Sequence, residues 1–236
     1  MGLDIYVMPL WRFLAQDFEM VIERDCKRLG TKPPKLVTEQ GLVQRPQRPP
    51  DAYRINTFKR KARNVQERVA EGNRPTPINW NDEGECVYGE RCADRGMQSL
   101  RTYALWLSRK DSPTLTPPPD DDFYKHPIWQ THKPGSTSFS HLIDHDCYSS
   151  YYLPCDFEKV TNVEKISTAA GTGHRVAASA FQLQRELREV TASIESNAGL
   201  ESLPENHSNA IRQACAQMNL VAGLSCKQGL PIIFWG

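Results

Sequence analysis

The stretch LDIYVMP, from Leu3 to Pro9, alternates in polarity along its length. Leu3, Ile5 and Val7 are aliphatic, whereas Asp4 and Tyr6 between them carry polar groups. Because successive side chains of a β-strand point to opposite faces, this alternation predicts a strand that begins almost at the first residue. The remaining elements must then be arranged around a sheet that contains this strand.

A second apolar run, Leu230–Trp235, follows Gly229 near the other end of the chain. A strand that is apolar on both faces is usually interior to a sheet. We therefore expect Leu3–Val7 and Ile232–Trp235 to lie in one sheet, where they can be neighbouring strands. The two helices that precede the second strand are expected to pack on this sheet.

Five segments have the apolar periodicity of helices that bury one face. In the first, Asp17 is the predicted N-cap. The fourth has an apolar seam from Val176 to Ile194, and the fifth follows Ser202–Glu205, which matches a capping box. The predicted helices are 17–29, Thr57–Glu71, Cys92–Arg109, about 20 residues around the seam, and the segment containing Ile211–Ser225.

Stretches rich in proline or glycine separate these elements and predict irregular loops. They are Thr31–Pro50, with a short strand at Lys35–Thr38, then Thr76–Gly89 and Ser112–Gly135. We predict a single α+β domain over residues 1–236, with a long irregular Pro-rich insertion at about 112–137. Its small mixed β-sheet contains both chain termini and is packed by several α-helices.

The overall composition restricts the expected partners and location of the protein but does not identify its function. The net charge of +1 gives no overall attraction to nucleic acid, membranes or acidic substrates. The first residues lack a basic signal-peptide region, and no apolar run reaches the roughly 20 residues of a membrane helix. The seven cysteines contain no Cys-x-x-Cys pair, which favours reduced thiols. We expect a soluble, cytoplasmic protein without a membrane partner.

The block HLIDHDCYSSYYLPCDF, His141–Phe157, concentrates groups that bind metals or move protons. His141, Asp144 and His145 could hold a divalent metal, which would activate water in a metal-dependent hydrolase. His141, His145 and Asp146 are the candidate catalytic residues, with a histidine as general base. Cys147 beside a histidine suggests a nucleophile.

These chemical interpretations of the block compete with a plainer one. His145-Asp146 matches the paired ligands of HD-type phosphohydrolases, but those ligands lie on helices, whereas this stretch predicts loop and strand. A polar turn whose Asp and His side chains bond to the backbone explains the same residues, and we favour it. The alternation from Tyr151 to Phe157 predicts a strand, with Pro154 at an edge or bulge.

Three blocks occur together in this chain: MGLDIY at Met1–Tyr6, HLIDH at His141–His145 before YYLPCDF at Tyr151–Phe157, and GLPIIF at Gly229–Phe234. In this combination the chain resembles a family of uncharacterised bacterial proteins, some of them linked to mobile elements. The resemblance implies no established activity.

Three further sites are weaker. Gly171-Thr-Gly-His-Arg175 precedes a predicted helix, where backbone N–H groups and Arg175 could hold a phosphate. Tyr151 and Arg175 are the candidate ligand-binding residues. Cys86 and Cys92, with Cys147 and Cys155, could form a zinc site, although their spacing matches no known zinc motif.

The segment Arg45–Arg74 has nine Lys and Arg against three Asp and Glu. It is the only hint of nucleic-acid binding, and its few aromatic residues give base stacking little support. Asp120–Asp122 could neutralise it within the chain. Without a complete catalytic pattern, we expect a non-enzymatic binding, immunity or accessory-type protein that engages a protein partner. The alternative is a metal-dependent hydrolase that uses the His141–Asp146 cluster.

Overall fold

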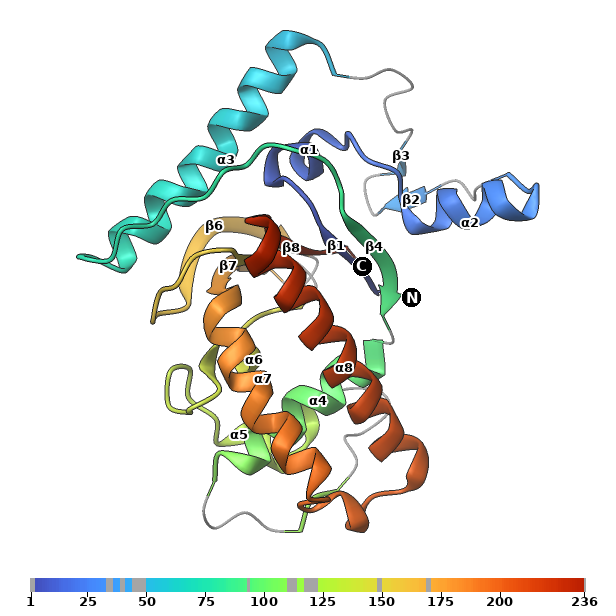
Figure 1. Ribbon diagram of the computed structural model, residues 1–236, viewed down its shortest axis with the longest axis vertical. Helices are drawn as coiled ribbons and strands as arrows, with labels where there is room; N and C mark the ends of the chain where they lie inside the picture. The colour runs from blue at the N-terminus through green and yellow to red at the C-terminus, as the bar shows by residue number, and fades with distance from the viewer. Residues whose placement is uncertain are drawn as a thin grey trace.

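The described chain builds a six-stranded mixed β-sheet with helices on both faces (Figure 1). The computed structural model describes residues 3–32, 36–38, 41–43, 50–92, 94–109, 114–116, 123–147, 150–168 and 171–235. In chain order the elements are β1 (Leu3–Val7), α1 (Leu10–Ala15), α2 (Val21–Leu29), β2 (Leu36–Thr38), β3 (Gly41–Val43), α3 (Ala52–Gly72), β4 (Tyr88–Cys92), α4 (Asp94–Leu107), η1 (Phe123–Lys125), α5 (Pro127–Gln130), α6 (Ser140–Ile143), β5 (Tyr151–Leu153), β6 (Thr161–Thr168), β7 (Gly171–Ser179), α7 (Ala180–Glu195), η2 (Leu200–Ser202), α8 (Glu205–Gln228) and β8 (Ile232–Trp235).

The strand order is β4-β1-β8-β5-β7-β6, which confirms the predicted α+β class. The first and last strands are antiparallel neighbours, with Ile5 opposite Phe234 and Tyr6 opposite Ile233. β5 pairs with β7 in parallel, and all other pairs in this sheet are antiparallel. The described part of the chain has one further sheet, the two-stranded β2–β3.

The alternation of the strands divides the core between the two sheet faces. In β1, Leu3, Ile5 and Val7 join the buried cluster formed with α4, α6, α7 and α8. Tyr6 instead joins the cluster formed with α1 and α3. β8 follows the same rule, because Phe234 belongs to the first cluster and Ile233 to the second. A period of two therefore supplies apolar side chains to both layers at once.

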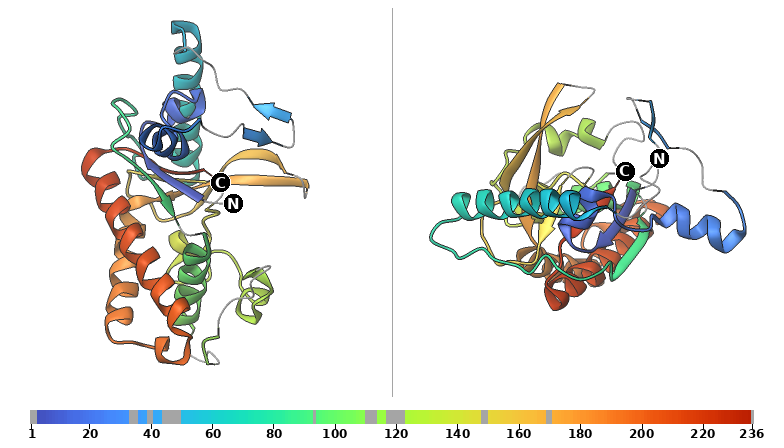
Figure 2. Two further views of the ribbon diagram at one scale, coloured as in Figure 1. Left: turned by 90° about the vertical axis from the view of Figure 1, so that its right-hand side faces the viewer. Right: turned by 90° about the horizontal axis from the view of Figure 1, so that it is seen from above.

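Several elements extend away from this core (Figure 2). The β6–β7 hairpin and β2–β3 project beyond the helices, and α2 lies to one side of the sheet. α3 lies at one end of the long axis, and the connection between α7 and α8 lies at the other (Figure 1). Among the described residues, every helix is too short or too polar to cross a lipid bilayer.

The predicted helix 17–29 is wrong at its start, because residues 17–20 link α1 to α2 and are not helical. α1 ends at Ala15, and its C-cap residue Gln16 has a φ of 58°, in the left-handed region. Asp17 caps no helix and instead forms an ion pair with Arg12 at 3.4 Å. α2 starts only at Val21, where the Glu23 side chain accepts a hydrogen bond from the Met20 N–H. Its end at Gly30, with φ of 65°, is as predicted.

The predicted helix seam is also wrong at its start. Val176 lies in β7, and α7 begins at Ala180 with Ser179 as N-cap, whose hydroxyl accepts from the Gln182 N–H. The predicted capping box fails as well, because the Ser202 hydroxyl donates to the carbonyls of Leu115 and Gly199. α8 therefore begins at Glu205 without a side-chain cap.

The loop and strand predictions are partly confirmed. The short strand near Lys35–Thr38 is present as β2, whereas β5 ends at Leu153 instead of reaching Phe157. β4 and the β6–β7 hairpin were not predicted. Within the insertion at 112–137, η1 and α5 are helical, and 112–113 and 117–122, which include Asp120–Asp122, lie outside the described residues.

Candidate functional site

The one-turn helix α6 holds the first histidine of the central block. Its first N–H groups have no partner within such a short helix, and the oxygens of the buried Glu186 carboxyl group accept them. The His141 N–H donates at 2.9 Å and the Leu142 N–H at 2.7 Å. Burial raises the pKa of Glu186 to about 8, against the opposing effect of these two hydrogen bonds. Glu186 thus ties α7 to the start of α6.

His141 uses both ring nitrogens to join three segments. Nδ1 accepts from the Ser179 N–H at 2.8 Å, so Nε2 carries the proton and donates to the Glu158 carbonyl at 3.0 Å. Burial lowers the pKa of His141 to about 4. A neutral imidazole with both nitrogens engaged has no free site for a metal or for a substrate proton.

His145 is buried by aromatic packing. Its ring stacks on Tyr152 with centroids 3.8 Å apart, and Tyr152 donates its hydroxyl hydrogen to the His141 carbonyl. Burial and the nearby Arg101 guanidinium lower the pKa of His145 well below its usual value. Neither ring nitrogen has hydrogen-bond geometry to a described residue. Tyr152 therefore connects the two histidines, through its ring to His145 and through its hydroxyl to the His141 backbone.

The carboxylates of the block do not complete a metal site. Asp144 contacts His132 Nε2 at 2.7 Å and accepts from the Gly135 N–H at 2.7 Å. Asp146 is half-buried and Cys147 is buried. No three His, Cys, Asp or Glu side chains in the described ranges are placed to share a metal ion. The metal and catalytic assignments remain predictions without geometric support.

The glycine segment before Arg175 lies inside a strand, so its interpretation as a helix N-terminus is wrong. Arg175 instead bonds Glu164 on β6 at 2.7 Å, and its guanidinium lies 5.3 Å from the Tyr151 ring centre. Tyr151 itself is buried. The structure thus brings Tyr151 and Arg175 together, with the arginine already paired.

The four cysteines of the suggested zinc site are free and differ in exposure. Cys86 is exposed on the segment before β4, whereas Cys92, Cys147 and Cys155 are buried. Burial raises the pKa of Cys155 to about 11. Buried cysteines of this kind act as small apolar residues.

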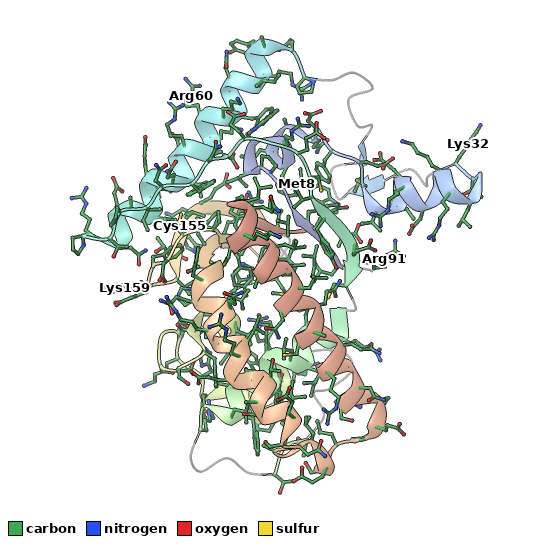
Figure 3. All side chains as sticks on the ribbon, in the orientation of Figure 1. Met8, Lys32, Arg60, Arg91, Cys155 and Lys159 are labelled. Carbon is green, nitrogen blue, oxygen red and sulfur yellow. The ribbon has the colours of Figure 1, made fainter. Side chains whose placement is uncertain are left out.

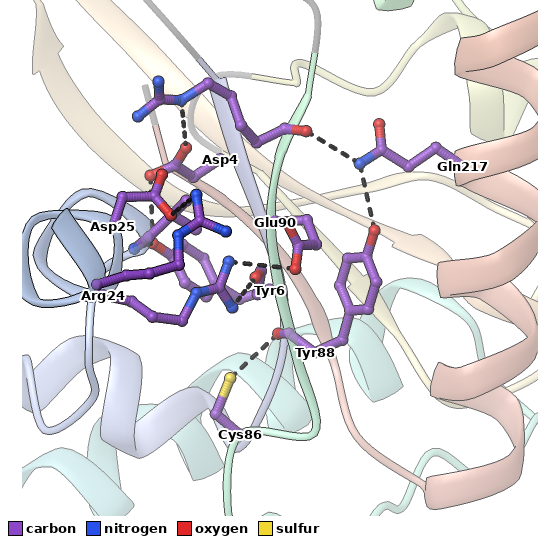
Figure 4. A network of polar contacts seen from close by, with 12 residues as sticks. Asp4, Tyr6, Arg24, Asp25, Cys86, Tyr88, Glu90 and Gln217 are labelled. Atoms are coloured by element: carbon purple, nitrogen blue, oxygen red, sulfur yellow. Dashed lines mark hydrogen bonds and ion pairs between the residues drawn. The ribbon is translucent and has the colours of Figure 1, made fainter.

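The N-terminal block organises a polar network beside the sheet edge (Figure 4). The buried Tyr6 hydroxyl donates to Asp4 and accepts from the Val21 N–H at the start of α2. Arg24 then bonds the Gly89 carbonyl and the Glu90 carboxylate of β4. Burial raises the pKa of Asp4, against the effect of Arg91, 3.7 Å away.

The carboxylates around α2 and β4 are consequently paired. Glu19 binds Lys27, Asp25 binds Arg28, and Glu83 binds Lys59. The Asp82 oxygens accept the N–H groups of Leu10 and Trp11 at the start of α1. This surface is rich in charge, but its negative charge is neutralised within the molecule.

The connection between α7 and α8 is different. From Glu189 to Ile211 the chain has no lysine or arginine. Four carboxylates in this stretch are exposed and have no hydrogen bond or ion pair within the described residues. We call these residues the acidic tip: Glu189, Glu195, Glu201 and Glu205. The connection that they flank lies at the end of the molecule opposite α3 (Figure 1), where the Arg212 guanidinium bonds the Ile194 carbonyl and the Asn197 side chain.

Comparison with known proteins places the chain in a family. A family model described as "Putative DNA-mimic protein" matches residues 1–234. The chain belongs to this family. No curated protein matches the chain, and no solved structure matches it.

This membership overturns the expected relation to partners. The sequence suggested an unspecified protein partner and treated nucleic acid as unlikely, with Arg45–Arg74 as its only hint. That expectation was wrong, because the family description makes DNA the molecule that is imitated. The family description refers to likeness to DNA, which is a different relation to nucleic acid from binding it through a basic segment.

Sequence reasoning missed Glu186, Ser179 and the acidic tip. Glu186 could have been found, because a charged residue beside Leu183 and Leu187 interrupts the apolar stripe of α7. The tip could also have been found from the absence of basic residues between Glu189 and Ile211. The role of Ser179 depends on where the strand becomes a helix, which the sequence pattern did not locate.

Proposed function

We propose that this protein is a non-enzymatic binding protein that engages a DNA-binding protein in place of DNA. The family match over residues 1–234 carries this proposal. The buried and bonded state of His141 and the stacked His145 agree with it, because neither side chain is available for catalysis.

With a net charge of +1, the chain cannot imitate DNA over its whole surface. DNA carries one negative charge for about every 1.7 Å of its axis, so mimicry needs a local surface of unpaired carboxylates. The acidic tip meets this requirement better than the surface around α2 and β4, where each anion has a partner. We propose the acidic tip as the surface that replaces the phosphates.

The test is displacement from DNA. DNA-binding proteins from a cell extract are loaded on DNA-cellulose, and the column is eluted with this protein at low salt. The expected result is the release of a discrete DNA-binding protein, which is identified by mass spectrometry. Release should weaken as the salt concentration rises, because exposed charges are screened.

Two variants make the test specific. The quadruple change of Glu189, Glu195, Glu201 and Glu205 to Gln should abolish release. The matched control Glu83→Gln/Glu90→Gln removes two paired carboxylates and should release the same protein as the original chain. Equal release by all three forms would show that the acidic tip is not the binding surface, and the absence of any release would count against DNA mimicry.

We also propose that the described elements work as one domain, since both apolar clusters pack on opposite faces of one sheet. Limited proteolysis that yields two stable fragments would contradict this. The seven free cysteines support a cytoplasmic location, where thiols stay reduced. Fractionation of expressing cells tests that location.

A further inference from the structure

The outer side of α3 carries a groove that no part of the proposed function uses. A cavity of about 440 Å³ is lined by residues from three turns of the helix: Tyr53, Asn56, Thr57, Lys59, Arg60 and Arg63. This volume falls within the roughly 300–1,000 Å³ of small-molecule sites. We call it the α3 groove. Arg60 is labelled on α3 in Figure 3.

A second cavity, of about 150 Å³, adjoins the first through Lys59 and Arg63 and extends to Trp80. Trp80 is 8% exposed, and its indole N–H has no hydrogen-bond partner in the described structure. It lies near the Asp82 carboxyl, whose pKa burial raises to about 6, without the geometry of a hydrogen bond. Because the indole nitrogen is itself buried, Trp80 closes this end of the groove and does not offer a donor to a ligand.

The charges of the groove are only partly neutralised. Lys59 forms an ion pair with Glu83 at 2.6 Å, and the Asp82 oxygens are occupied by the start of α1. Arg60 and Arg63 are exposed and form no hydrogen bond or ion pair with other described residues. Two guanidinium groups one turn apart therefore remain available for an anion.

An aromatic ring lies at the other end of the same groove. Tyr53 is 80% exposed and lines the cavity one turn before Asn56. Along a helix the ten residue steps from Tyr53 to Arg63 span about 15 Å. A guanidinium pair holds phosphate oxygens in a fork, a tyrosine ring stacks on a planar ring, and an amide can bond the edge of that ring.

We propose that the α3 groove binds a small organic phosphate that carries a planar ring, the chemistry of a mononucleotide. Arg60 and Arg63 contact the phosphate, and Tyr53 stacks on the ring. A polymer fits less well, because the basic stretch is bounded by the exposed carboxylates of Asp51 and Glu67. This site lies at the opposite end of the long axis from the acidic tip and does not depend on it.

Titration calorimetry at low salt tests the proposal with four probes: adenosine monophosphate, ribose 5-phosphate, inorganic phosphate and adenosine. We expect saturable binding of one adenosine monophosphate per chain. Binding should be weaker for ribose 5-phosphate and inorganic phosphate, which lack the ring, and weakest for adenosine, which lacks the phosphate.

Variants identify the groups that bind. Arg60→Ala/Arg63→Ala should weaken adenosine monophosphate binding at least tenfold, and Tyr53→Ala should weaken it more than Tyr53→Phe. The matched control Arg68→Ala removes an exposed arginine of the same helix outside the groove and should leave the affinity unchanged. All of these positions are exposed or half-exposed, and unchanged melting curves would verify the fold.

Three results would overturn the proposal. They are no saturable binding of any phosphate, equal affinity in Arg60→Ala/Arg63→Ala, and tighter binding of a single-stranded oligonucleotide than of the mononucleotide at equal phosphate concentration. The last result would identify a polymer site instead. The displacement assay with the tip variants is independent of each outcome.

Discussion

In the central block, His141–Phe157, the side chains of His141 and Tyr152 are buried and bonded to neighbouring segments, whereas the four carboxylates of the acidic tip are exposed and have no partner among the described residues. In sequence the block resembles a reactive site, and the tip resembles the ordinary connection of two helices. In the structure, the tip and not the block has side chains that can contact another molecule. Glu186 and His141 are occupied by backbone groups, and Glu201 and Glu205 are free to meet another molecule.

This difference shows that the types of residue in a stretch identify a functional site only when the hydrogen bonds of their side chains are also known. A buried polar group must be satisfied from within the protein, so its chemistry is used for folding. An exposed carboxylate costs little to leave unpaired in water, so its charge is available for long-range attraction. If this contrast is correct, changes in the block should affect stability, and changes at the tip should affect binding alone.

The largest expected effect comes from Glu186→Ala. It leaves the N–H groups of His141 and Leu142 buried without acceptors, which should lower the free energy of unfolding by roughly 2–5 kcal/mol. Urea unfolding measures the loss. The matched control is Glu189→Ala, three residues further along α7 and exposed, which should change stability by less than about 0.5 kcal/mol. A loss below 1 kcal/mol for Glu186→Ala would show that the block is not held as described.

The pH dependence of stability is the second test. The pKa of Glu186 rises from 4.5 to about 8 on folding. Its contribution to the free energy of unfolding is therefore full below pH 4.5 and is lost as the pH rises to about 8. The pKa of His141 falls from 6.5 to about 4, so its contribution is present above 6.5 and is lost as the pH falls. From pH 6.5 to 8 only the Glu186 effect remains, and stability should decline by roughly 2 kcal/mol.

Urea unfolding at several pH values in this range measures the decline, and Glu186→Gln should flatten it because the amide does not titrate. Stability that rises from pH 6.5 to 8 in the original chain would contradict a buried, protonated Glu186.

A smaller effect is expected from Tyr152→Phe. The change removes the hydroxyl that donates to the His141 carbonyl at 3.0 Å but keeps the ring that stacks on His145. Stability should fall by about 1 kcal/mol, the usual net value of one hydrogen bond. Tyr152→Leu, which also loses the stacked ring, should cost clearly more. Equal losses for the two variants would mean that the stacking contributes nothing.

The smallest effects concern the charged surfaces. Glu201→Gln/Glu205→Gln should leave stability within about 0.5 kcal/mol of the original chain, because these carboxylates have no partner to lose. Glu90→Gln breaks an exposed ion pair with Arg24 and should cost about 0.2–1 kcal/mol, less at high salt. Thermal unfolding at low and high salt separates the two cases. A larger loss at the tip than at Glu90 would reverse the distinction between free and paired carboxylates.

Elements with a strong apolar period were predicted well. The alternation of Leu3–Val7 placed β1 in the sheet interior, and the apolar run near the C-terminus gave its neighbour β8. The seam from Leu183 to Ile194 located most of α7. In each case the pattern exists because one side of the element is buried, so the sequence records the tertiary environment.

Elements without such a pattern were missed. β4, YGERC, is half-exposed at the sheet edge, and Asn162, Glu164 and Lys165 of β6 are exposed. Such strands are held by hydrogen bonds between backbones, which leave no trace in side-chain hydrophobicity. The same limit applies to the central block. The sequence singled out His141 as a candidate catalytic and metal-binding residue, but its structural partners Ser179 and Glu186 are distant in the chain and could not be found by local spacing.

The place of β8 between β1 and β5 has a consequence for synthesis on the ribosome. Until Ile232–Trp235 is translated, the sheet exists at most as two separate parts, β4-β1 and β5-β7-β6, each with an apolar edge open to other chains. At a synthesis rate of about 5–20 residues per second, the edge of β1 that later pairs with β8 stays unpaired for roughly 10–45 s. A nascent or prematurely terminated chain that lacks β8 should therefore be a substrate for chaperones and proteases.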